Sequence, residues 1–100
     1  MLLKMGVYID RVSRNIRRAF PKIDNAFIQV IGEEVVITCS DSGDHSAGSL
    51  HYDREKYGAV DLRNPKKNKP LVIARLKLEL GPDYDVVDEG DHIHIEFDPK

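Results

Sequence analysis

The chain has 100 residues, of which 15 are Lys or Arg and 17 are Asp or Glu, and its formal net charge is −2. This length suits one domain over residues 1–100, and the charge lacks the basic excess of nucleic-acid-binding proteins. With 41% hydrophobic residues the chain is too apolar to be disordered, yet no apolar run is long enough for a transmembrane helix. We expect a globular monomer that binds neither nucleic acid nor membrane.

The cysteine content and the amino-terminal sequence narrow the class of protein further. Cys39 is the only cysteine, which excludes an internal disulfide and a Cys-rich zinc finger. Any metal site must therefore use His, Asp and Glu. Asp10 and Arg11 interrupt the amino-terminal stretch before a long apolar core forms, unlike in a secretory signal. We expect synthesis in the cytoplasm without a signal peptide.

Hydrophobic periodicity in the first half of the chain predicts one helix and two strands. Apolar residues spaced by three and four predict a helix over 5–20, with a solvated arginine face, and Pro21 is expected to end it. Residues 26–31 and 34–39 are rich in Val, Ile, Phe and Thr and predict strands. The Gly-, Ser- and Asp-rich segment 40–48 predicts a long loop of the kind that often carries function.

The second half predicts a strand, a helix and a hairpin. A short strand is expected over 57–62. Asn68 can cap a helix with Pro70 in its first turn, and that helix should end at Gly81. The side chains that this helix is expected to bury include Leu71, Ala74 and Leu78. Strands over 84–87 and 92–97 should form a hairpin. This order predicts an α+β domain with a largely antiparallel sheet and two flanking helices.

The carboxy-terminal strand carries unusual polar residues. Alternation places Ile93, Ile95 and Phe97 on one face, and His92, His94 and Glu96 on the other. Two imidazoles and a carboxylate in a row can bind a metal or shuttle protons. The alternative interpretation is a solvated strand face.

Asp61 is a second candidate. It ends a short apolar strand with small residues at 58 and 59, which predicts a carboxylate that points inward and needs a cation or several donors. His51 could supply a neighbouring metal ligand. The alternative is an ordinary turn with a salt bridge from Asp61 to Arg54 or Arg63.

Two separate motifs share a pattern with a known family. The first is Ser49-Leu50-His51 followed by Gly58-Ala59-Val60-Asp61, and the second is Asp91-His92-Ile93-His94-Ile95-Glu96. Together they resemble the M15 peptidases, zinc enzymes that share the D-Ala-D-Ala carboxypeptidase and Hedgehog-type fold. That family carries Ser-x-His, then Gly and Ala before an Asp, and later an acidic residue three positions before a His-x-Glu. The resemblance covers roughly residues 36–98.

The resemblance implies a zinc site and roles for its residues. Zn²⁺ would be held by His51, Asp61 and His94, with one position left for water. Asp91 would take a proton from that water and pass it to the leaving amine. Glu96 would orient a histidine or bind a substrate amine. Further residues expected to contact substrate or support the site are Ser49, Arg63, His92 and His45, although Arg63 could instead pair with a carboxylate of the fold.

The implied function is a zinc metallopeptidase that hydrolyses peptidoglycan stem peptides. The bond would be D-Ala-D-Ala, as in a carboxypeptidase, or L-Ala-D-Glu, as in an endopeptidase. A small enzyme of this kind resembles a phage endolysin, which acts at the bacterial cell wall after holin-dependent release.

Three features leave alternatives open. His51 precedes Asp61 by ten positions, whereas seven is usual in the family. His92 is an additional histidine beside His94. Glu89 and His92 also have the acid-x-x-His spacing, so Glu89 could be the base and His92 the zinc ligand in place of Asp91 and His94. The chain could therefore be a catalytically silent zinc-binding module of the same fold, or a small α+β domain without a metal.

Overall fold

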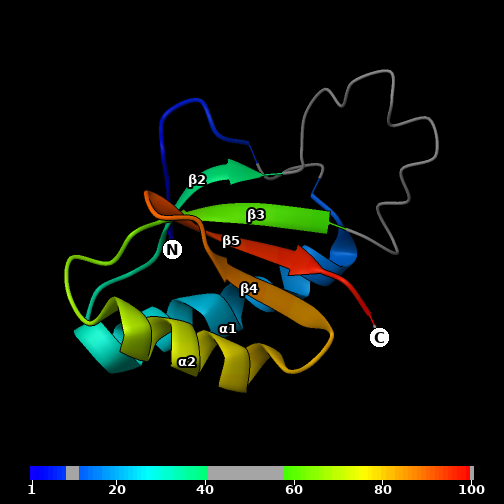
Figure 1. Ribbon diagram of the computed structural model, residues 1–100. Coiled ribbons are helices and arrows are strands. Elements are labelled where there is room, and N and C mark those ends of the chain that lie inside the picture. The colour runs from blue at the N-terminus through cyan, green and yellow to red at the C-terminus, as the bar shows by residue number, and fades with distance from the viewer. Residues whose placement is uncertain (9–11, 41–57, 100) are drawn as a thin grey trace.

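The structure is a computed structural model that describes residues 1–8, 12–40 and 58–99. Its elements are β1 (Leu2–Leu3), α1 (Arg14–Ile31), β2 (Val36–Ser40), β3 (Gly58–Arg63), α2 (Lys69–Leu80), β4 (Tyr84–Asp88) and β5 (His92–Phe97). The strands form one sheet in the order β1-β2-β3-β5-β4, in which only the β1–β2 pair is parallel. Both helices lie on the same side of this sheet (Figure 1). The predicted α+β fold, with a mostly antiparallel sheet and two flanking helices, is confirmed.

Helix α1 begins later and ends later than the sequence predicted. It starts where the buried Ser13 hydroxyl accepts the backbone N–H of Ile16 at 3.2 Å. It ends at Gly32, whose φ of 73° is the left-handed conformation that glycine adopts readily. The predicted helix over 5–20 is therefore correct for residues 14–20 and wrong for residues 5–8, 12 and 13, and the predicted strand over 26–31 is wrong.

Pro21 lies inside α1 and does not end it. A proline in a helix interior costs about 3 kcal/mol, because it removes one backbone hydrogen bond and crowds the preceding turn. Beyond Pro21, however, the helix buries Ile23 and Phe27 almost completely. Each such burial contributes about 1.5–3 kcal/mol, so packing of the second half of α1 outweighs the local penalty.

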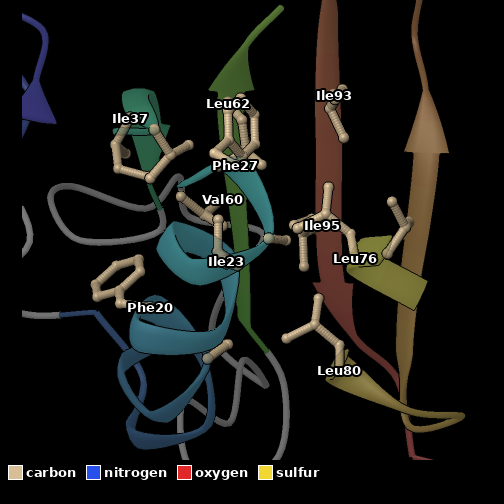
Figure 2. Packing of buried hydrophobic residues seen from close by; sticks show 14 of the residues in the cluster. Phe20, Ile23, Phe27, Ile37, Val60, Leu62, Leu76, Leu80, Ile93 and Ile95 are labelled. Atoms are coloured by element: carbon tan, nitrogen blue, oxygen red, sulfur yellow. The ribbon is translucent and has the colours of Figure 1, made fainter. Parts of the chain in front are cut away.

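The core lies between the helices and the sheet (Figure 2). Its largest fully buried side chains include Ile16 and Ile23 from α1, Leu62 from β3, and Ile93 and Ile95 from β5. The predicted inward face of β5 is thus confirmed for both isoleucines. The predicted arginine face is exposed at Arg14, Arg17 and Arg18 of α1, and Arg11 lies outside the described residues.

Helix α2 has the predicted extent but buries a different face. It runs from Lys69 to Leu80 and buries Val72, Leu76 and Leu80. Leu71 and Leu78 are instead 59% and 75% exposed, so the predicted inward face is wrong. Apolar residues occur on several sides of this helix, and its periodicity therefore does not select one face. None of the helices in the described ranges is long and apolar enough to cross a membrane.

Candidate metal and catalytic site

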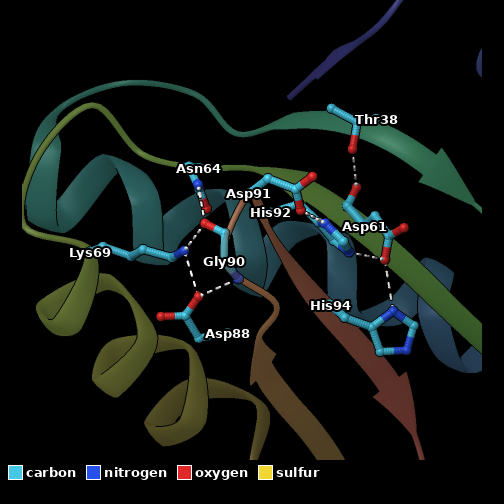
Figure 3. A network of polar contacts seen from close by, with 9 residues as sticks. All are labelled: Thr38, Asp61, Asn64, Lys69, Asp88, Gly90, Asp91, His92 and His94. Carbon is cyan, nitrogen blue, oxygen red and sulfur yellow. Dashed lines mark hydrogen bonds and ion pairs between the residues drawn. The ribbon is translucent and has the colours of Figure 1, made fainter.

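The pairing of β3 with β5 brings Asp61 and His94 together. These residues are direct partners in the antiparallel register, so their side chains lie on the same face of the sheet. The carboxylate oxygen Oδ1 of Asp61 lies 2.7 Å from Nδ1 of His94 (Figure 3). Asp61 does not point inward as expected. Its side chain is 26% exposed and lies on the face opposite the helices.

His94 contacts a carboxylate with each ring nitrogen. Nδ1 meets Asp61, and Nε2 lies 3.3 Å from Oε1 of Glu96. Partial burial lowers the pKa of His94, but the hydrogen bonds and charges of Asp61 and Glu96 outweigh it and raise this pKa above its usual value. The imidazole is therefore held in place at both nitrogens.

His92 lies on the same face and extends the row of ionisable groups. Its Nδ1 is 2.6 Å from Oδ1 of Asp91, and its Nε2 is 3.6 Å from Oδ1 of Asp61. The hydrogen bond from His92 lowers the pKa of Asp91, whose side chain is 90% exposed. Carboxylates and imidazoles thus alternate along the sheet in the order Asp91, His92, Asp61, His94 and Glu96.

The remaining residues singled out in the sequence have different outcomes. His45, Ser49 and His51 fall outside the described residues. Arg63 is exposed at the end of β3, directly opposite His92. The backbone N–H of the exposed Glu89 donates to the carbonyl of His92 at 3.0 Å, so Glu89 closes the hairpin.

The sequence analysis missed an acidic cluster beside Glu96. Asp85 faces Glu96 across the β4–β5 pair. In the described ranges, a set of three potential ligand atoms within 4.8 Å of one another occurs at Asp85, Glu96 and Asp98. Such a set offers oxygen ligands alone, which suit hard cations better than zinc. The alternation of acidic residues along 83–85 and 96–98 was the available signal.

A second missed feature is a polar network around the β4–β5 turn. It links Lys69, at the start of α2, to Asp88 and to the backbone of Gly90 (Figure 3). The sequence feature that could have indicated this network is Lys69 in the first turn of a helix, because the helix dipole disfavours a cation there.

The site therefore offers an imidazole nitrogen and a carboxylate oxygen side by side on the sheet face opposite the helices. Such a pair can share a proton or hold a divalent cation. Comparison of the chain with family models, curated proteins and solved structures found no match.

Proposed function

We propose that this protein is a zinc-dependent peptidase of the M15 type that hydrolyses peptidoglycan stem peptides at the bacterial cell wall. The observation that carries the proposal is the contact of Asp61 with His94 at 2.7 Å, because these are two of the three ligands that the sequence resemblance implies. The third, His51, is proposed from the resemblance alone.

The donor set fits zinc. Imidazole nitrogen and carboxylate oxygen are both common zinc ligands. A histidine that binds a metal usually donates its other ring N–H to a carboxylate. His94 has this arrangement, with Nδ1 toward Asp61 and Nε2 toward Glu96. The geometry thus supports Glu96 as the group that orients His94.

The distances also favour one of the two ligand assignments. Oδ1 of Asp61 lies 2.7 Å from His94 but 3.6 Å from His92. Asp91 and His94 are therefore better candidates for the acid-x-x-His pair than Glu89 and His92.

Each residue then has a chemical role. Bound zinc would supply a Lewis acid that lowers the pKa of water. The Asp91 carboxylate is ionised at neutral pH, as an ordinary aspartate is, and its hydrogen bond to His92 lowers its pKa further. It would accept a proton from the attacking water and return it to the leaving amine. His92 holds the Asp91 carboxylate at 2.6 Å. Asp61 and His94 would be zinc ligands, and Glu96 would hold the other ring nitrogen of His94.

A second candidate is a zinc-binding module without turnover. One observation favours it: Asp91 is 90% exposed and contacts His92 rather than Asp61 or His94. The ten-residue spacing from His51 to Asp61 points the same way.

The test measures zinc content and peptide cleavage, and it compares His92 with His94, two histidines of β5. Zinc content should fall in His51→Ala, Asp61→Ala and His94→Ala, and persist in His92→Ala. The wild-type protein should cleave a synthetic stem peptide that contains both an L-Ala–D-Glu and a D-Ala–D-Ala bond, and a chelator should abolish this activity.

The outcomes separate the hypotheses. If the Asp91→Ala variant retains zinc but no longer cleaves the peptide, the peptidase hypothesis is supported. Zinc without cleavage by the wild type favours the binding module, and protein without zinc rejects both. Loss of zinc in His92→Ala but not in His94→Ala would favour the alternative pair of Glu89 and His92.

A further inference from the structure

The turn between β4 and β5 is held at both polar groups of Gly90. Its N–H donates to Oδ1 of Asp88 at 2.9 Å. Its carbonyl accepts from Nδ2 of Asn64 at 2.9 Å and from Nζ of Lys69 at 3.1 Å. Lys69 also donates to Asp88 at 2.6 Å, which closes the network. The peptide unit that leads into Asp91 is thereby fixed from outside the hairpin.

The segment 64–69, which supplies Asn64 and Lys69 to this network, is locally unfavourable at three positions. Lys69 is the first residue of α2, where the helix dipole disfavours a cation. Asn68 precedes it with a φ of 56° and makes no capping hydrogen bond with its side chain. Oδ1 of Asn64 is buried and has no hydrogen-bond partner among the described residues. Deviations of this kind gather at functional sites, because the local cost must be offset by another role.

We propose that Lys69 and Asn64 are positioning residues for Asp91. The proposal rests on the proposed peptidase function, in which Asp91 transfers the proton. Lys69 and Asn64 hold the carbonyl of Gly90, and the direction of the chain at Asp91 follows from the peptide unit that begins there. Asp91 can then meet His92 at 2.6 Å on the face that carries Asp61. Neither residue contacts the zinc ligands Asp61 or His94 in the network, so they act on proton transfer and not on metal binding.

The experiment uses the zinc-loaded protein and the stem peptide described above. Lys69→Met and Asn64→Ala should lower kcat by about tenfold or more, since small displacements of a catalytic group have large effects on rate. KM and zinc content should stay unchanged. Lys69→Arg, which keeps a charged donor, should recover much of the loss. Lys67→Met, at an exposed lysine two residues before Lys69, is the matched control.

An NMR readout separates this inference from the proposed function. In the wild type, the Gly90 amide should be protected from hydrogen exchange, and the Asp91 β-protons should show NOEs to the His92 ring. Lys69→Met should lose both signals, and Lys67→Met should keep them. A kcat for Lys69→Met equal to that of Lys67→Met would overturn the inference. If the wild type cleaves nothing, the proposed function fails, and the NMR signals alone decide: their loss in Lys69→Met supports the positioning role and their retention overturns it.

Discussion

Asp61 and His94 stand directly opposite each other on β3 and β5, with Oδ1 and Nδ1 separated by 2.7 Å. The register of two central strands sets this distance, and Val60, Leu62, Ile93 and Ile95 anchor that register because they fill the core from the other face. The pair therefore does not depend on a loop for its geometry, and its chemistry can be tested with the metal-free protein.

The first prediction concerns the pH dependence of stability without metal. The folded-state pKa of His94 is raised, because the two carboxylates outweigh the opposing effect of burial. Its charged form therefore stabilises the fold at pH values below its unfolded pKa of about 6.5, and this contribution is lost as pH rises through the folded-state pKa. Replacing His94 with Gln should cost about 1 kcal/mol at pH 5.5 and less at pH 8.5.

Urea unfolding of metal-free wild type and His94→Gln at the two pH values measures this difference. Cys39→Ser, which alters an exposed side chain of β2, serves as the control and should show the same small effect at both. A His94→Gln penalty that is equal at pH 5.5 and 8.5 would show that the carboxylates do not hold the charged ring.

The second prediction compares two leucines of α2. Leu76 is fully buried, whereas Leu78 is 75% exposed. Leu76→Ala should lower the free energy of unfolding by about 2–5 kcal/mol, and Leu78→Ala should change it by less than about 0.5 kcal/mol. Equal losses in the two variants, measured by urea unfolding, would contradict the observed orientation of the helix.

This pair of leucines also shows where sequence reasoning reaches its limit. The start and end of α2 could be predicted from Pro70 and Gly81, because these helix-boundary signals are local, although the Asn68 side chain does not form the predicted capping hydrogen bond. Its buried face could not, since apolar residues lie all around it and tertiary contacts with α1 and β4 select one side. Pro21 shows the same limit, because the packing of Ile23 and Phe27 outweighs a local rule.

For the candidate site, strand alternation predicted which face of β5 carries His92, His94 and Glu96. It could not predict that Asp61 faces His94, because register between strands depends on the whole sheet. Only the resemblance to the M15 peptidases predicted that Asp61 and His94 lie at the same site. The network around Gly90 was not predicted, since Lys69 and Asp88 are far apart in the sequence and meet only when α2 packs beside the hairpin.

The third prediction concerns the start of α1. The Ser13 hydroxyl accepts the N–H of Ile16 at 3.2 Å, and the side chain is buried. Ser13→Ala should therefore destabilise the protein by about 1 kcal/mol in thermal or urea unfolding. Ser13→Thr keeps the acceptor and should lose less. An Ala variant as stable as wild type would mean that the helix start is set by packing alone.

The last prediction concerns zinc and pH together. Zinc and a proton compete for the same nitrogen of His94, and the raised pKa of that ring makes the proton a strong competitor in acid. At pH 7.5, zinc at about 100 times its Kd should stabilise the folded protein by about 2.7 kcal/mol, with a rise in Tm on the order of 10 °C. At pH 4.5 the same zinc concentration should have almost no effect on Tm.

Circular dichroism at pH 4.5 must first show that the metal-free protein is folded, because loss of the fold would also remove the effect of zinc. His92→Ala is the matched control: it leaves Asp61 and His94 in place and should show the same response to zinc at both pH values as the wild type. Asp61→Ala should show no response at either pH. Zinc that stabilises the wild type equally at pH 7.5 and 4.5 would exclude an imidazole ligand, because a ring with a pKa above about 6.5 is almost fully protonated at the lower pH.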